Sequence, residues 1–430
     1  MAETALAEEA QPLVMGLPAP PPALRWTVLV VLSLIGFASG YIYDCVGPLA
    51  RVLALQLHFS NTDIGLLQGA SSLPNLGMVL LGGIITDRIG VKKATAMFAW
   101  LVLAGTLITA LSPRLGLMVA GRLLYGLGSG SLSVALNTAI AKWFRGAKLS
   151  FVFGLSLTIA RLGSLASQTG PIWARSAFGD WRGPLLLAIL VGLLGFLCAG
   201  AYWVLETRAA PRYDLGPQGL GGKGPVRGLF RFTQSYWLVA LLCVTFYAGI
   251  FPFQTFAQKF LIEARGVTAS RASVLVGIPT VIAMVGSPLF GLLVDRIGRR
   301  ALFMAGGTAL LVPTYLMLGY GHLGLWVPMV MMGVAFALVP AVMWPAVMLI
   351  VPREDLGKAF GLMSMIQSFG LCGFNFLIGW VNDAAGASEA HPAGYNPGLW
   401  LFTGSVLLGL VFALLLRRRE SGGQGHGLES

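Results

Sequence analysis

The sequence predicts an all-α membrane protein of twelve transmembrane helices, arranged as two pseudo-symmetric halves of six helices each. Three observations predict this fold: the composition, a series of apolar runs of membrane-spanning length, and a repeat of the first half in the second. Of the 430 residues, 56% are hydrophobic and 11% are charged, and the mean hydropathy is +0.78. A soluble domain carries about 25% charged residues. The composition therefore excludes a soluble enzyme and a soluble nucleic-acid-binding protein.

Apolar runs of about 20 residues, the length that crosses a ~30 Å hydrocarbon core, occur twelve times. They lie near residues 26–50, 62–86, 94–112, 115–139, 151–173, 184–205, 236–260, 272–294, 301–320, 323–350, 356–381 and 398–416. One long hydrophilic segment, rich in Gly, Pro and Arg, separates the first six runs from the last six, and this composition is typical of a linker. We therefore expect a tail at 1–24, a first half at 25–206, the linker at 207–235, a second half at 236–417 and a second tail at 418–430.

The net charge of +12 follows from the positions of the basic residues. Lys and Arg gather in alternate loops, for example in residues 88–93, 142–148 and 296–300. Cytoplasmic loops of membrane proteins carry an excess of Lys and Arg, so we expect both termini and the linker on the cytoplasmic side and no nucleic-acid partner. The chain has no Asn-x-Ser/Thr acceptor and is rich in Ala and Gly. These features favour the inner membrane of a bacterium over a lysosomal membrane.

The two halves share a loop motif at matching positions. Gly83-x-x-x-Asp87-Arg88-Ile89-Gly90-x-Lys92-Lys93 lies between the second and third runs, and Gly291-x-x-x-Asp295-Arg296-Ile297-Gly298-Arg299-Arg300 lies between the eighth and ninth. The offset from Gly83 to Gly291 is 208 residues, and at the same offset Gly69 matches Gly277. An internal repeat of a six-helix unit is typical of a transporter whose halves move about a central site.

The doubled loop resembles the signature loop of the major facilitator superfamily, and Gly121-Arg122-x-x-x-Gly126-x-Gly128 is similar to that superfamily's second motif. The resemblance covers nearly the whole chain and implies the major facilitator fold and an alternating-access mechanism. It also implies that Asp87 or Asp295 pairs with Arg and with a neighbouring helix N-terminus, holding the cytoplasmic faces together in one conformation. The expected gating residues are Gly83, Asp87, Arg88, Gly90, Arg122, Gly291, Asp295, Arg296 and Gly298.

Three ionisable side chains, Asp44, Arg122 and Arg161, lie well inside the expected spans. A charge inside the membrane costs several kcal/mol unless it is paired or faces water. Asp44 and Arg122 both lie about 10 Å from the outer boundary, at 1.5 Å per residue, so they are candidate partners. The first interpretation is a structural or gating ion pair. Direct substrate contact and, for Asp44, proton coupling are the alternatives.

Arg161 has no acid at its own depth in any other expected span. It lies about 16 Å from the cytoplasmic boundary, near the midplane, where the substrate sites of transporters are found. A guanidinium presents two parallel donors that suit a carboxylate or a phosphate, so we expect the substrate to supply the missing anion. The alternatives are capping of a carbonyl in a broken helix and pairing with Asp44 through water.

Further motifs surround Arg161 and continue into the second half. They include Asn137-Thr138, Trp143-Phe144-Arg145-Gly146, Ala160-Arg161-x-Gly163-Ser164, Phe251-Pro252-Phe253, Trp344-Pro345 and Ile366-Gln367. Together they resemble the lysosomal dipeptide uniporters of the superfamily. That resemblance implies that Arg161 holds the carboxylate of a peptide and that Trp344 lines the pocket. A proline-kinked helix flanked by an aromatic residue is an equally simple interpretation of Trp344.

The chain departs from this resemblance at Gly130, where the family has an acid suited to the amino group of a peptide. A zwitterion then lacks its cationic-end partner unless Asp44 supplies it. Transport of an organic anion or an amino acid, with or without proton coupling, is therefore the alternative function. A non-transporting sensor or accessory subunit is a remote alternative.

The expected substrate is a small carboxylate-bearing solute, with dipeptides first. Because no Walker loop is present and buried acids are few, facilitated transport fits the sequence better than ATP-driven or tightly proton-coupled transport. We expect no enzymatic activity, no metal, no cofactor, the lipid bilayer as environment, and a monomer. Side-chain hydrogen bonds between helices are an alternative role for the polar candidates. The expected substrate-binding residues are Arg161, Trp344, Tyr43, Asp44, Asn137, Phe251 and Gln367.

Overall fold

The computed structural model describes residues 18–144, 149–215, 231–321, 324–352, 355–422 and 425–429, and all the regular secondary structure in these ranges is helical. Most of the first expected tail and most of the expected linker lie outside the described residues. The first half contains α1 (Pro22–Asp44), α2 (Val46–Leu57), α3 (Asn61–Ala70), α4 (Asn75–Ile89), α5 (Val91–Leu111), α6 (Leu115–Trp143), α7 (Leu149–Gln168), α8 (Gly170–Trp173), η1 (Ala177–Gly179) and α9 (Arg182–Ala209). The second half contains α10 (Gln234–Arg265), α11 (Ala269–Ile297), α12 (Arg300–Ala309), α13 (Leu311–Tyr320), α14 (Trp326–Ile350), α15 (Leu356–Ala384), η3 (Pro392–Tyr395) and α16 (Asn396–Glu420).

The helices match the expected spans in order. Within the described residues ten helices are long and apolar enough to cross a membrane, and α3 with α4, bent by 58° between Asn61–Val79 and Leu81–Ile89, makes an eleventh. The remaining expected span, residues 151–173, coincides with α7 and α8. The all-helical membrane fold predicted from the apolar runs is therefore confirmed.

The first span is interrupted at Cys45, between α1 and α2, and Pro48 lies in the first turn of α2. Proline has no N–H, so it cannot donate the helical hydrogen bond to the carbonyl four residues earlier, that of Asp44. The interruption exposes carbonyl groups at the end of α1 inside the protein. Such groups need other donors, because buried backbone acceptors are rarely left unpaired.

The two signature loops have the same backbone geometry at their glycines. Gly90 joins α4 to α5 with φ of 87°, and Gly298 joins α11 to α12 with φ of 70°. Positive φ is readily adopted only by glycine, which explains why both copies of the motif carry glycine at this position. In the second copy Arg299 also has positive φ, at 51°.

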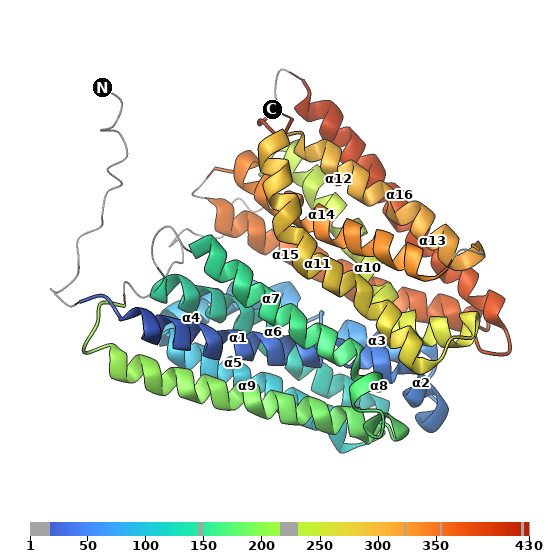
Figure 1. The fold of residues 1–430 in the computed structure, drawn as a ribbon, viewed down its shortest axis with the longest axis horizontal. Helices are drawn as coiled ribbons and strands as arrows, with labels where there is room; N and C mark the ends of the chain where they lie inside the picture. Colours follow the sequence, from blue (N-terminus) through green and yellow to red (C-terminus); the bar gives the residue numbers. More distant parts are fainter. Residues whose placement is uncertain are drawn as a thin grey trace.

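The two halves form separate bundles that meet at one end and diverge toward the other, where α1 begins and α16 ends (Figure 1). We call these the closed end and the open end. The closed end carries α2, α3 and α8, and the open end carries both signature loops. Contacts between the halves are made by α2, α3, α4, α7 and α8 with α10, α11 and α15. A cavity between the halves is therefore closed off on one side of the protein.

Small residues bring the halves together at the closed end. A Cβ added to Gly65 of α3 would lie 2.1 Å from the carbonyl oxygen of Asn375 in α15, and one added to Gly69 would lie 2.9 Å from that of Cys372. Gly277 of α11, which matches Gly69 in the repeat, lies against Leu165 of α7. Small residues spaced four apart let membrane helices approach closely. The repeat thus places glycine at both pseudo-equivalent crossings between the halves.

Candidate substrate cavity

A cavity of about 610 Å³ lies between the two halves. Its walls come from α1, α4, α6 and α7 of the first half and from α10, α14 and α15 of the second. A cavity of this size suits a small organic molecule. Seven of its lining residues are those expected to bind substrate: Tyr43, Asp44, Asn137, Arg161, Phe251, Trp344 and Gln367.

Arg161 projects from α7 across the cavity to the second half. Its Nη1 donates a hydrogen bond of 3.3 Å to Oγ of Ser287 in α11, and its guanidinium lies 5.2 Å from the ring centre of Phe336 in α14. It forms no ion pair with any acid among the described residues. A serine hydroxyl and an aromatic face leave most of the five donors of a guanidinium unused, so Arg161 retains the capacity to bind an anion from the cavity.

An aromatic wall stands opposite α7. Phe251 stacks on Tyr247 with ring centres 5.6 Å apart, and it meets Phe336 edge to face at the same distance and Tyr43 edge to face at 6.2 Å. Nε1 of Trp344 donates a 3.1 Å hydrogen bond to the hydroxyl of Tyr247. The indole is therefore held by a polar contact as well as by its position beside Pro345 in α14. Tyr247, Phe336 and Ser287 are contacts that the sequence motifs did not single out.

Arg122 does not pair with Asp44, contrary to the first interpretation from depth. Its two terminal nitrogens donate to the carbonyl oxygens of Ile42 (2.9 Å) and Tyr43 (3.1 Å) and to Oε1 of Gln68 (2.8 Å). The interruption at Cys45 frees the two carbonyls, and a guanidinium can satisfy both at once. Arg122 is 1% exposed, so it is a buried cap of a broken helix. The carbonyl-capping role considered for Arg161 belongs to Arg122.

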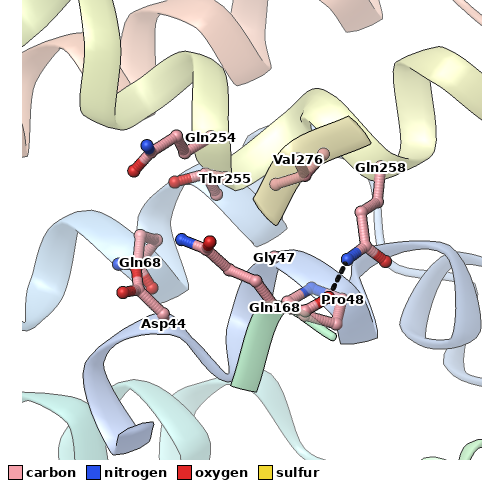
Figure 2. Close-up of a pocket in the computed structure, with 9 residues that line it drawn as sticks. All are labelled: Asp44, Gly47, Pro48, Gln68, Gln168, Gln254, Thr255, Gln258 and Val276. Atoms are coloured by element: carbon pink, nitrogen blue, oxygen red, sulfur yellow. Dashed lines mark hydrogen bonds between the residues drawn. The ribbon is translucent and has the colours of Figure 1, made fainter. Parts of the chain in front are cut away.

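Asp44 therefore keeps its carboxylate without an ion pair among the described residues. Among the described residues that line the cavity, Asp44 is the only acid and Arg161 is the only base. Asp44 also lines a second, much smaller pocket of about 10 Å³ toward the closed end, beside Gln68 and Gln254 (Figure 2). A pocket of that volume holds about one water molecule. Asp44 thus lies at the inner limit of the cavity.

Glutamines seal the protein beyond Asp44. Nε2 of Gln258 in α10 donates a 2.7 Å hydrogen bond to the carbonyl oxygen of Gln168 in α7 (Figure 2). Oγ1 of Thr280 in α11 donates a 2.8 Å hydrogen bond to Oε1 of the same glutamine. Both bonds join one half to the other. On the outer side of this seal, Gln258 also lines a surface pocket of about 240 Å³.

Gly130, where the resemblance implied an acid, faces the side chain of Asn75. A Cβ added to Gly130 would lie 2.2 Å from Oδ1 of Asn75, so the amide fills the space that a longer side chain at 130 needs. Both residues line the cavity. Oδ1 of Asn75 is buried and has no hydrogen-bond partner among the described residues. The neutral amide of Asn75 on α4 thus occupies the place of the acid that the resemblance implied on α6. The sequence of α6 by itself does not reveal this neighbour.

Asn137 in α6 of the first half and Gln367 in α15 of the second half are polar residues of the cavity wall. Both line the cavity, and the side-chain amide of neither is hydrogen-bonded to another described residue. The alternative role in helix–helix hydrogen bonding is therefore not what these two amides do in this conformation. Their donors and acceptors are free for a molecule in the cavity.

In this conformation the hydrogen bonds and ion pairs that the signature loops form with described residues lie within one half of the protein. Asp87 is exposed and forms no ion pair with a described residue. Asp295 pairs with Arg300 at 3.0 Å, across its own loop to the start of α12. The remaining expected gating residues are Gly83, Arg88, Gly90, Gly291, Arg296 and Gly298, and they lie at the open end.

A polar cluster at the closed end holds the halves together and was missed by sequence reasoning. Asp383, in the last turn of α15, accepts hydrogen bonds from the backbone N–H groups of Asn61 (2.8 Å) and Thr62 (2.7 Å) in the first turn of α3. Nζ of Lys259 donates to Oδ1 of Asn61 at 2.7 Å and lies 3.2 Å from Glu263. The available sequence signal is the capping box formed by Ser60 and Asp63, which marks a helix start but not its partner.

Comparisons with known proteins agree with the cavity and the repeat. The family model described as "Major Facilitator Superfamily" matches residues 32–372 and, in a second match, residues 238–429. The chain is 31% identical over 378 residues to the lysosomal dipeptide transporter MFSD1 of Homo sapiens, covering 85% of this chain and 81% of that protein. The MFSD1 protein of Danio rerio is also 31% identical, over 376 residues that cover 84% and 81% of the two chains.

The fold is also similar to that of solved transporters. A bacterial homologue of the human lysosomal transporter Spinster, in an inward-facing and unoccupied conformation, superimposes with a TM-score of 0.73. The sequence identity is 16%, and the match covers 93% of this chain and 98% of that one. These relatives are membrane transporters and not enzymes. The chain therefore belongs to the major facilitator superfamily of multi-pass membrane transporters and, within it, to the family of the lysosomal dipeptide transporter MFSD1.

Proposed function

We propose that this transporter carries small carboxylate-bearing solutes, with dipeptides as its main substrates, by facilitated transport. The observation that carries the proposal is the unpaired guanidinium of Arg161 in the cavity between the halves. An unpaired charge inside a membrane protein is costly, and a substrate carboxylate compensates it with two parallel hydrogen bonds. The 31% identity to proteins named as dipeptide transporters supports the choice among carboxylates.

The aromatic wall supports a peptide over a bare inorganic anion. Phe251, Tyr247, Phe336 and Trp344 present apolar faces beside the guanidinium. Such a surface binds the aliphatic or aromatic side chains of a peptide without selecting strongly among them. The free amides of Asn137 and Gln367 supply donors and acceptors for a peptide group.

Transport of an organic anion or an amino acid, with or without coupling to protons, is the second candidate. The observation that favours it is the neutral surface at Gly130, where Asn75 takes the place of a charged side chain. An organic anion needs Arg161 but no acidic partner. The two candidates therefore share the anion site and differ at the other end of the substrate.

Thermal stabilisation by ligands separates these candidates. Purified protein is heated with dipeptides, single amino acids and dicarboxylates, because a ligand that binds only the folded state raises its stability by RT ln(1 + [L]/Kd). Dipeptides are expected to stabilise the wild type, and Arg161→Ala is expected to lose that effect, whereas Arg161→Lys retains a charge and loses the bidentate geometry. Stabilisation by dicarboxylates alone would support the second candidate. Stabilisation of Arg161→Ala by dipeptides would contradict both.

We further propose that the protein functions as a monomer in the cell inner membrane with both termini in the cytoplasm. The excess of basic residues in the loops on the side of the termini supports this orientation. The open end then faces the cytoplasm, and the conformation described is inward-facing. Reporter fusions at each terminus that are active only in the cytoplasm test the orientation, and two inactive fusions would reverse it.

A further inference from the structure

Among the described residues that line the cavity, one side chain is acidic and one is basic. Asp44 and Arg161 both line the cavity, and neither forms an ion pair with a described residue. Arg122 is the cation that depth pairs with Asp44, but its two terminal nitrogens donate to two backbone carbonyls and to Gln68. A cavity with two opposite charges that have no ion-pair partner among the described residues is complementary to a molecule that carries both.

The packing of α1 on α7 fixes the separation of the two charges. A Cβ added to Gly40 of α1 would lie 2.5 Å from the carbonyl oxygen of Ala160 in α7 and 3.3 Å from Oγ of Ser164. Asp44 is four residues beyond Gly40, and Arg161 is one residue beyond Ala160, along helices that both run toward the closed end. At 1.5 Å per residue, Asp44 lies about 5 Å farther toward the closed end than Arg161. An extended dipeptide spans at most about 7 Å.

The break between α1 and α2 also favours a cationic partner for Asp44. Pro48 has no N–H and cannot donate to the carbonyl of Asp44, so this carbonyl adds a further acceptor beside the carboxylate. An ammonium group has three donors and no acceptor, and it matches a carboxylate beside a carbonyl that lacks its helical donor.

We propose that Asp44 binds the amino-terminal ammonium group of the substrate whose carboxylate Arg161 binds. This inference rests on the proposed function, since it presupposes the anion site at Arg161. It makes Asp44 the residue that selects zwitterionic peptides with a free amino group over peptides that are blocked at that end. Asp44 thus supplies the negative charge for the ammonium group of the substrate, which the neutral residues Gly130 and Asn75 cannot supply.

Binding of matched peptides tests the assignment. L-alanyl-L-alanine and N-acetyl-L-alanyl-L-alanine share a carboxylate and differ in the charge of the amino end. We expect the wild type to bind the free peptide about 10-fold or more tightly than the acetylated peptide, because a hydrogen bond to a charged group contributes roughly 10-fold or more in affinity. Asp44→Asn, which keeps the shape of the side chain, is expected to weaken the free peptide about 10-fold and leave the acetylated peptide unchanged. Asp180→Asn removes an exposed acid outside the cavity and serves as the matched control.

The outcomes separate this inference from the proposed function. Retention of the wild-type preference for the free peptide in Asp44→Asn overturns the assignment of Asp44. A variant that keeps this preference but loses the pH dependence of transport also overturns it, because Asp44 is then a proton site. Unchanged binding of the acetylated peptide shows that Asp44→Asn is folded. Failure of the proposed function is recognised differently: Arg161→Ala still binds both peptides, or the wild type binds neither.

Discussion

The carboxylate of Asp383 accepts hydrogen bonds from both the backbone N–H (2.7 Å) and the hydroxyl (2.5 Å) of Thr62, and it thereby caps the N-terminus of α3 from the opposite half of the protein. The role expected for Asp87 and Asp295 in the signature loops rests on the same interaction, in which a carboxylate caps the N-terminus of a neighbouring helix. In this conformation the contact forms at the closed end, while Asp87 at the open end has no ion-pair partner among the described residues. The two ends of the protein thus differ in the contacts that join the halves.

Asp383→Asn is expected to open the closed end. The amide removes the negative charge from a cluster of charge-assisted hydrogen bonds, each worth about 1.5–3 kcal/mol, and so favours the alternative conformation roughly 10- to 100-fold. The measurement is labelling of Val276→Cys, in a chain without its native cysteines, by a membrane-impermeant maleimide. Asp63→Asn perturbs the start of the same helix without contacting the other half, and equal labelling of both variants would refute the role of Asp383.

Gly65→Ala is expected to impair transport and stability. The added methyl group would lie 2.1 Å from the carbonyl oxygen of Asn375, so α3 and α15 must separate for the closed end to form. Gly404→Ala in α16 is the matched control, since a Cβ there meets nothing within 4 Å, and alanine in a helix is favoured over glycine by about 1 kcal/mol. Thermal unfolding and uptake into proteoliposomes are measured for both. A Gly65→Ala protein as active as Gly404→Ala would show that the crossing tolerates separation.

Arg122→Leu is expected to destabilise the protein by about 3 kcal/mol or more. The substitution leaves the buried carbonyl of Ile42 and the amide oxygen of Gln68 without donors, at a cost of about 1–3 kcal/mol each, and leaves the carbonyl of Tyr43 only the donor from Nε2 of Gln68. Asp44→Asn removes none of these hydrogen bonds, so its effect on the free energy of unfolding is expected to be smaller. Denaturant unfolding of both single variants and the double variant measures this. If both single variants lose the same free energy of unfolding and the double variant loses no more, the result would instead support the ion pair between Asp44 and Arg122 that was expected from the sequence.

Asp87→Asn is expected to lower the transport rate without lowering the stability of this conformation. The side chain is exposed here, and substitutions at exposed positions usually change stability by less than about 0.5 kcal/mol. Its contribution is expected when the open end closes, a conformation that every transport cycle must visit. The rate of uptake and the thermal midpoint are compared with those of Asp180→Asn. A normal rate in Asp87→Asn would argue against a gating role for the first signature loop.

The sequence determined the features that depend on local chain properties. The number and order of the spans follow from apolar length, the two halves from the repeat between Gly83 and Gly291, and the loop glycines from the need for positive φ at Gly90 and Gly298. The lack of an acidic partner for Arg161 could also be predicted from the sequence, because no acid occurs at its depth in the other expected spans. These properties need no knowledge of how the helices are rotated about their axes.

Only the tertiary structure decided which side chains meet. Depth paired Arg122 with Asp44, but the interruption at Cys45 supplied carbonyls that satisfy Arg122 instead. Likewise Asn75 occupies the space beside Gly130, and Asp383 reaches a helix start more than 300 residues earlier in the chain. Apolar length fixes where a helix crosses the membrane, whereas helix rotation, helix breaks and close crossings are set by packing between segments distant in the sequence.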